Sequence, residues 1–269
     1  MIVMMRRLAV SVVLCGVVLG PLAASAQPPD TVLLEELTWT ELRDAVRGGK
    51  TTIIVPAGGT EQNGPHMALG KHNARVKALS QSIARVLGDA LVAPVIAYVP
   101  EGTITPPTAH MRFPGTITVP EEAFQAVLEF AARSFKLHGF RNIVLLGDHG
   151  STQAGQKAVA ARLNREWAAT AVRVHAIEEY YRTGAVEVSR LYRDRGYRDA
   201  ELGGHAGLTD TALMLATDAR LVRADRRPGS AEDGVEGDPT RATAELGRAG
   251  VELIVTRTAD AVRKSITHR

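Results

Sequence analysis

The chain has 269 residues, and its 32 basic and 29 acidic side chains nearly balance. The single cysteine, Cys15, lies in an N-terminal apolar run, so the rest of the chain contains no disulfide, no thiolate ligand and no cysteine nucleophile. The near-neutral charge also argues against a nucleic-acid surface. A catalytic or metal site would therefore have to use His, Asp, Glu and Asn side chains.

The first 26 residues have the pattern of a secretory signal peptide. Arg6 and Arg7 precede the apolar run Leu8–Leu19, and the small residues Ala24–Ala26 follow it. This run is short for a membrane span, which favours cleavage over anchoring. We therefore predict that residues 1–26 are removed and that residues 27–269 form a single domain. The mature protein is then periplasmic or secreted and free of the membrane.

Beyond this segment, strand-like and helix-like runs alternate. Apolar, β-branched runs predict buried strands at Thr51–Pro56, Leu91–Tyr98, Asn142–Leu146 and Ala171–Ile177. Helical spacing predicts helices at 73–87, 120–138, 153–167, 207–216 and 240–265, the last open to a break near Gly250. The alternation predicts an α/β sandwich with a largely parallel sheet.

Three less regular segments stand between these elements. Residues 99–119 and 183–205 have weak periodicity and predict long loops, which in compact domains are often functional. Residues 226–238 are polar and rich in glycine, and predict a segment that wraps the surface. In parallel sheets the functional loops lie at the carboxyl ends of the strands.

Polar clusters follow the first and third predicted strands. After the first come Glu61, Asn63, His66 and His72, which could supply oxygen and imidazole ligands to one divalent ion. The alternative is a polar turn that caps the next helix. After the third strand, glycines flank Asp148 and His149, a suitable place for a ligand or for an exposed turn.

Two further segments carry histidines. His205 lies in a glycine-rich turn before a helix, where it could act as a general acid or base, and Asp210 could be a ligand or could orient it. The alternative is a helix start with a solvated His205 and a capping Asp210. In the long loop, His110 and Phe113 could line a pocket or simply pack.

Together these segments resemble the creatininase family of metal-dependent amidohydrolases. Five stretches carry the resemblance in the family's order: Glu61–His66 (its Glu-Gln-His-Gly-Pro-His), His110–Ile117 (its His-x-x-Phe-Pro-Gly-Thr-Ile), Asp148–Gly150 (its Gly-His-Gly), His205–Thr211 (its His-Ala-Gly-x-x-Glu-Thr) and Gly234–Glu245. The resemblance implies a three-layer α/β/α fold, often oligomeric. It also implies hydrolysis of cyclic or linear amides at a two-metal site, commonly of zinc or manganese.

The ligand positions depart from the family's pattern. Asn63 stands where the family has histidine, His72 where it has aspartate, and Ser151 where creatininases have an acid, which makes creatinine itself an unexpected substrate. A carboxylate can bridge two cations, but an imidazole nitrogen with one lone pair cannot. The change at His72 therefore predicts a weakened second metal site and favours a single ion.

The resemblance assigns roles to eleven residues. We expect Glu61, His72, His149 and Asp210 to bind Zn²⁺ or Mn²⁺, with Fe²⁺ also suitable, as one or two ions. His205 would transfer protons in hydrolysis of a small amide substrate. Supporting or substrate-contacting residues would be Gln62, Asn63, His66, His110, Asp148 and Ser151.

The resemblance also leads us to expect a homo-oligomer. The departures motivate an alternative function, that of a non-catalytic binding or scaffold protein that keeps the fold. The position of the four expected ligands should distinguish the two functions. Convergence within coordination distance would favour the enzyme. Scattered side chains, or a salt bridge that fills the centre, would favour the alternative.

Overall fold

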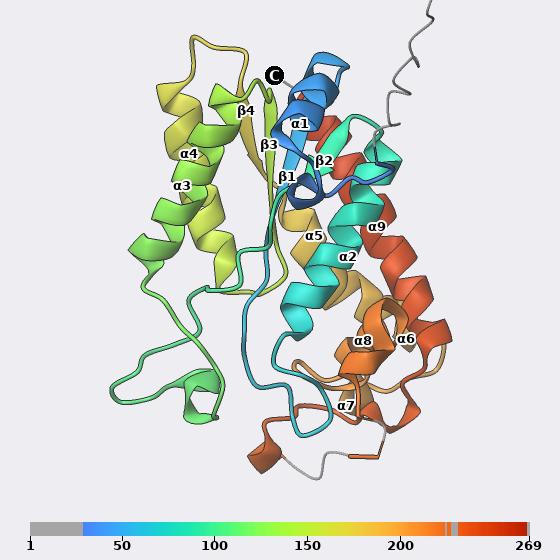
Figure 1. Ribbon diagram of the computed structural model, residues 1–269. Coiled ribbons are helices and arrows are strands. Elements are labelled where there is room, and N and C mark those ends of the chain that lie inside the picture. The colour runs from blue at the N-terminus through green and yellow to red at the C-terminus, as the bar shows by residue number, and fades with distance from the viewer. Residues whose placement is uncertain (1–28, 224, 227–230, 268–269) are drawn as a thin grey trace, which may run out of the picture.

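The computed structural model describes residues 29–223, 225–226 and 231–267, so the expected signal peptide lies outside the described residues. At its centre is a four-stranded parallel sheet in the order β2-β1-β3-β4 (Figure 1). The strands are β1 (Thr52–Ala57), β2 (Ala90–Val92), β3 (Asn142–Gly147) and β4 (Arg173–Ala176). Strands β1 and β3 pair over their full length, with Ala57 opposite Gly147. Their carboxyl ends therefore meet at one edge.

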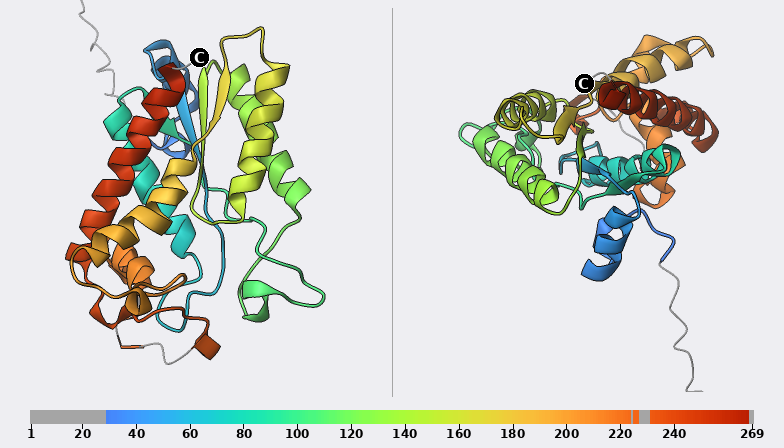
Figure 2. Two further views of the ribbon diagram at one scale, coloured as in Figure 1. Left: turned by 180° about the vertical axis from the view of Figure 1, so that it is seen from behind. Right: turned by 90° about the horizontal axis from the view of Figure 1, so that it is seen from above.

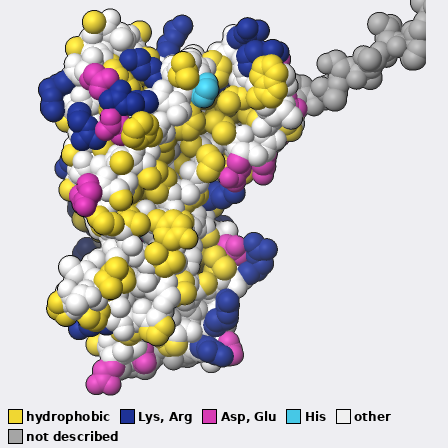
Figure 3. All heavy atoms as spheres, turned by 60° about the vertical axis from the view of Figure 1, so that its left-hand side comes forward, with side chains coloured by type: hydrophobic (Ala, Val, Ile, Leu, Met, Phe, Trp, Pro, Cys, Tyr) yellow, Lys and Arg dark blue, Asp and Glu magenta, His cyan; other side chains and the backbone are white. Residues whose placement is uncertain are grey.

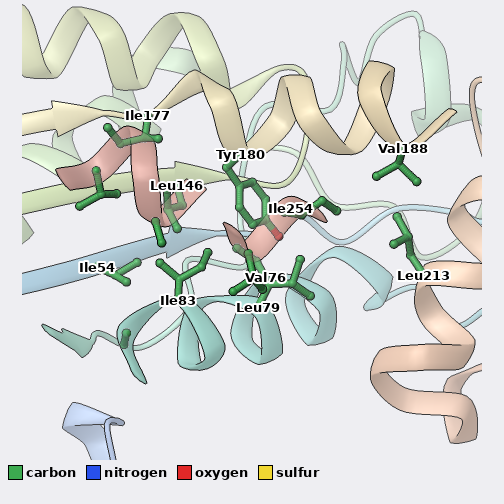
Figure 4. Packing of buried hydrophobic residues seen from close by; sticks show 14 of the residues in the cluster. Ile54, Val76, Leu79, Ile83, Leu146, Ile177, Tyr180, Val188, Leu213 and Ile254 are labelled. Carbon is green, nitrogen blue, oxygen red and sulfur yellow. The ribbon is translucent and has the colours of Figure 1, made fainter. Parts of the chain in front are cut away.

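Helices cover both faces of the sheet, because neighbouring residues of each strand point to opposite sides. On one face Ile53 and Val55 pack with helices α1 (Trp39–Arg47), α3 (Glu121–Leu137) and α4 (Thr152–Glu166). On the other face Ile54 and Val144 pack with helices α2 (Lys71–Leu87), α5 (Glu178–Arg182), α6 (Val188–Arg193), α8 (Leu208–Asp218) and α9 (Ala244–Thr267). Figure 2 shows the resulting three layers, and Figure 4 shows the second core from close by. The predicted sandwich is confirmed.

Two predicted strands are shorter than expected. Strand β2 ends at Val92 instead of continuing to Tyr98, because Pro94 follows and lacks a backbone N–H. Beyond it, Ile96 and Val99 make only isolated bridges, to Ala57 and Thr118. Strand β4 is limited to Arg173–Ala176.

The prediction of a loop over residues 183–205 is wrong. This stretch contains a π-helical turn (Thr183–Glu187), α6 and the short helix α7 (Asp199–Leu202). Val188 and Tyr192, four residues apart, form the buried side of α6. The apolar stripe is narrow, and Gly184 interrupts it, so the periodicity is weak in the sequence.

Helix α9 is unbroken at Gly250. A Cβ at this position would lie 2.7 Å from the Tyr192 hydroxyl and 2.9 Å from a Leu213 methyl. The glycine therefore lets α9 approach α6 and α8 closely, and it does not end the helix. Among the described residues, no helix is both long and apolar enough to cross a membrane.

Candidate functional site

A pocket of about 450 Å³ lies where strands β1 and β3 end. Its walls come from the loops after both strands, the first turns of α2, the α5–α6 segment and the His205 turn. The ionisable side chains that line it are Glu61, Lys71, His72, Arg75, His110, Asp148, Tyr180, Tyr181, His149, His205, Asp210 and Glu236. The π-helical turn contributes Gly184 and Ala185 to the wall. Such turns frequently occur at functional sites.

Glu61 is fully buried and offers its two oxygens to different partners. Its Oε1 lies 2.7 Å from His72 Nε2 and 3.6 Å from His205 Nδ1. Its Oε2 lies 3.3 Å from His149 Nε2 and 3.4 Å from His110 Nε2. Two groups of possible metal ligands therefore share Glu61, one with His72 and His149 and one with His110 and His205. Within each group the ligand atoms lie within 4.8 Å of one another.

Charge and burial act in opposite directions on Glu61. Burial alone would raise the pKa of its carboxyl, but the His149 and His72 imidazoles and the Lys71 ammonium lower this pKa below its ordinary value. The same contacts act on His149, where burial opposes protonation but Glu61 raises the pKa of the ring. Glu61 is therefore an anion at neutral pH.

His72 lies between two carboxylates. Its Nδ1 lies 2.5 Å from Asp148 Oδ1, and its Nε2 faces Glu61. Asp148 also accepts hydrogen bonds from Arg75 and from the Tyr180 hydroxyl. Burial would raise the pKa of Asp148, but Arg75 and His72 lower it. Asp148 can thus accept the Nδ1 proton and leave the Nε2 lone pair for a cation, a common arrangement behind metal-binding histidines.

Asp210 belongs to neither group of possible ligands. It accepts hydrogen bonds from Lys71 Nζ at 2.9 Å and from Arg75 Nη1 at 2.7 Å. These two buried cations hold the pKa of Asp210 well below its ordinary value, although burial opposes them. Lys71 Nζ also lies 3.7 Å from Glu61 Oε1. The structure thus brings three of the four expected ligands together and places the fourth in a salt-bridge network beside them.

The ring of His205 stacks on that of His110, with centroids 4.2 Å apart. The Nε2 of His205 lies 2.9 Å from the Gln62 carbonyl, to which it can donate, and this leaves the Nδ1 lone pair facing Glu61. Burial and Lys71 lower the pKa of His205 to about 4. Burial also lowers the pKa of His110. His205 is therefore neutral near pH 7 and can accept a proton.

The backbone is strained beside both of these histidines. In the described part of the chain, Ala109 (φ 47°) and Ala206 (φ 54°) are the non-glycine residues with left-handed φ. Such residues cluster at active sites, where the surrounding structure enforces them. Ala109 directly precedes His110, and Ala206 directly follows His205, so the two unusual backbone conformations help to orient these rings.

Of the remaining predicted residues, Gln62 and Ser151 contact the cluster, whereas Asn63 and His66 do not. The Gln62 amide contacts both His110 and His205, and Ser151 Oγ lies 2.6 Å from His149 Nδ1. Asn63 turns away and donates to the carbonyls of Glu61 and Ala68, so it holds the loop. His66 is buried and bonds to Thr211 outside the cluster.

Sequence reasoning missed Glu101, Lys71, Arg75 and Tyr180. The Glu101 side chain is buried, with Oε2 at 3.2 Å from His149 Nε2, and burial raises its pKa to about 8. The signal for Glu101 was weak, a single acid between Pro100 and Gly102 in a long loop. Lys71 and Arg75 flank His72 on one helix, where the sequence pattern gave them no role.

The donor atoms fit a divalent ion. Among the described residues, Glu61 Oε2 and both Glu101 oxygens are buried without a hydrogen-bond partner. Burying such anionic oxygens is costly unless a cation or a proton compensates. The spacings from Glu61 Oε2 to His149 and from His149 to Glu101 are 3.3 and 3.2 Å. Ligands bound at about 2.0 Å in a tetrahedron would be about 3.3 Å apart.

Known proteins resemble this chain over most of its length. Residues 35–262 match the creatininase family model, described as creatinine amidohydrolase. The mycofactocin precursor peptide peptidase of Mycolicibacterium smegmatis is 28% identical over 240 residues, which cover 79% of this chain and 84% of that protein. The creatinine amidohydrolase of Pseudomonas putida is 26% identical over 257 residues, which cover 87% and 97%.

Solved structures agree with the fold. A crystal structure of creatinine amidohydrolase superposes with a TM-score of 0.75 at 23% identity, covering 90% of this chain and all of that one. Manganese and zinc forms of creatininase are among the solved structures of this fold. The matched span, the motifs and the three-layer architecture lead to one conclusion: the chain belongs to the creatininase family.

Proposed function

We propose that the protein is an exported, metal-dependent hydrolase that cleaves an amide C–N bond. One observation carries the proposal: at the edge where β1 and β3 end, a buried anionic Glu61 meets His72 and His149 with ligand atoms within 4.8 Å of one another. Glu61, His72 and His149 would hold the ion. The manganese and zinc creatininases support Mn²⁺ or Zn²⁺ as that ion, and Fe²⁺ also suits two imidazoles and a carboxylate.

Such an ion, when bound, polarises a carbonyl group and lowers the pKa of water. The protein's own side chains do the rest. Asp148 orients His72, and Ser151 orients His149 through Nδ1. As water oxygen bonds to the carbonyl carbon and the C–N bond breaks, the neutral His205 accepts the water proton at Nδ1 and passes it to the leaving nitrogen. Gln62 fixes the His205 ring for this transfer.

The pocket and the relatives indicate the substrate class. A volume of about 450 Å³ suits a small molecule or the end of a peptide, not a folded chain. The relatives are named for a cyclic amide and for a precursor peptide. We therefore propose a small amide or a peptide terminus as substrate.

The test is metal analysis joined to hydrolysis. The mature chain is purified, its metal content is measured, and turnover of creatinine, lactams, formamides and short peptides is followed. Chelation should abolish turnover, and addition of a suitable divalent ion, with Mn²⁺, Zn²⁺ and Fe²⁺ each tried, should restore it. A protein without metal affinity and without turnover of any of these amides would remove the proposal.

One observation favours the non-catalytic alternative. His72 already contacts two carboxylates, and Lys71 lies 3.7 Å from Glu61, so the cluster has internal partners for its charge. If these contacts replaced the ion, the cluster would be a salt-bridged core. Metal analysis distinguishes the two, because a salt-bridged core would not gain stability from added ion.

Two proposals concern the setting of the enzyme. Residues 1–26 support export, which N-terminal sequencing of the protein from the periplasm or medium would test.

Exposed apolar residues on α3, namely Val127, Phe130 and Leu137, support self-association. Figure 3 brings this side of the molecule forward and shows hydrophobic side chains gathered across its middle.

A further inference from the structure

We infer that Glu101 is a ligand of the metal ion and that the site holds one ion. The side chains of Lys71 and Arg75 supply the remaining positive charge. The inference rests on the proposed function, because it assumes that Glu61 and His149 bind metal. It adds a residue from the long loop 99–119 that none of the sequence motifs includes.

Glu101 is built into the cluster. Its side chain is fully buried, and neither carboxylate oxygen has a hydrogen-bond partner among the described residues. Its Oε2 lies 3.2 Å from His149 Nε2, which in turn lies 3.3 Å from Glu61 Oε2. His149 Nε2 thus stands at the spacing of neighbouring ligands from one oxygen of each carboxylate.

The local backbone keeps the Glu101 carboxylate in this place. The Glu101 N–H donates to Thr118 Oγ1 at 2.9 Å, and Val99 pairs with Thr118. On the other side Gly59 has a φ of 142°, and a Cβ there would lie 2.6 Å from Glu101 Oε1. A glycine at position 59 therefore makes room for the carboxylate against the loop that carries Glu61.

The balance of charge predicts one ion. Six acidic or basic side chains are joined to the cluster by hydrogen bonds or ion pairs: Glu61, Glu101, Asp148, Asp210, Lys71 and Arg75. When all four carboxylates are ionised and the histidines are neutral, two negative charges remain. One divalent cation neutralises them, whereas two would leave an equal positive excess. Uncompensated charge in a buried site is expensive.

The ligand number bears on the metal. With Glu101, the protein offers two carboxylates and the imidazoles of His72 and His149. Four such ligands fill a tetrahedral Zn²⁺ site, whereas a six-coordinate Mn²⁺ or Fe²⁺ retains positions for water and substrate. We therefore expect the manganese or iron form to be the active one.

The experiment measures metal binding to the chelated, full mature protein. Co²⁺ and Mn²⁺ are titrated into wild type, Glu101→Gln and Glu236→Gln, with calorimetry for affinity and visible absorption for the Co²⁺ geometry. Glu236 is a matched control, because it lines the same pocket without contacting Glu61 or His149. Glu101→Ala repeats the test, and the thermal unfolding of each chelated variant reports its folding.

We expect one ion per wild-type chain. In Glu101→Gln the affinity should fall by more than the roughly 10–100-fold caused by loss of an outer partner. The Co²⁺ spectrum should change, while Glu236→Gln should match wild type. Equal affinity and an unchanged spectrum in both Glu101 variants would overturn the role of Glu101 and leave the proposed function standing. Two tight ions per chain would overturn the charge argument. A wild type that binds no ion would overturn the proposed function as well.

Discussion

At the scale of single residues, Glu101 makes the metal-free protein sensitive to pH. Burial raises the pKa of its carboxyl from 4.5 to about 8. Between these values the folded state keeps a proton that the unfolded state has released, so the free energy of unfolding falls as pH rises, by at most about 1.4 kcal/mol per pH unit. Urea unfolding of chelated protein at pH 5 and pH 8.5 measures this loss. Glu101→Gln cannot ionise, and a loss as large in this variant as in wild type would contradict the assignment.

Substitution of His205 should reduce turnover without affecting metal binding. Its pKa of about 4 keeps the ring neutral near pH 7, so Nδ1 can take a proton. We expect His205→Gln to lower kcat by about 10²–10⁴-fold, with little change in KM and no loss of metal. Steady-state kinetics and elemental analysis check this. The exposed His138, at the end of α3, gives the control His138→Gln. Loss of metal together with activity would instead make His205 a ligand.

The sequence revealed Glu61 and most of the histidines because each stands near the end of a strand or the start of a helix, whereas His110 was recognised from its motif in the long loop. It could not reveal Glu101, since its position depends on how residues 99–119 fold back through the Val99–Thr118 pairing. Asp210 shows the same limit. Its spacing to His205 suggested a ligand, but its partners Lys71 and Arg75 come from α2, more than a hundred residues earlier.

At the scale of elements, helix α2 supplies the positively charged side chains of the site. Its first turns place Lys71, His72 and Arg75 against Asp148 and Asp210. Removing the Arg75 guanidinium leaves both carboxylates with less compensation in a buried place. We expect Arg75→Met to lower the free energy of unfolding by about 3–5 kcal/mol. Denaturant unfolding checks this value.

The control for this change lies on the same helix. The Arg85 side chain is 52% exposed and makes long contacts with exposed Asp30, at 3.4 Å to its carboxylate and 3.5 Å to its carbonyl. Arg85→Met should therefore alter stability by no more than about 0.5 kcal/mol. If both variants lost the same stability, the buried network would not be the cause.

Elements with strong, regular patterns were predictable. The predicted strands β1 and β3 were confirmed, because strands buried on both faces of a sheet need continuous apolar, β-branched runs. The predicted helix α2 was confirmed as well, because its apolar stripe packs against the sheet. Helix α1 was missed, although Thr38 and Glu41 form the capping box that begins it. The helices after Thr183 were missed because a π-helical turn shifts their phase.

At the scale of the whole molecule, the exposed face of α3 predicts self-association. Val127 is 51% exposed and Phe130 is 68% exposed, and monomers seldom leave such residues grouped. We expect the mature protein to be an oligomer in light scattering and Phe130→Asp to shift it toward the monomer. The control Glu122→Gln lies at the start of the same helix. A monomeric wild type would contradict the proposal.

The stacking of His110 on His205 has a consequence for protons in the pocket. With ring centroids 4.2 Å apart, two imidazolium charges would repel each other by about 4 kcal/mol at an effective dielectric constant of about 20. The second protonation is thereby pushed far toward acid. The two rings together therefore behave as a store for a single hydrogen ion, because a charge on either ring makes the other ring less basic.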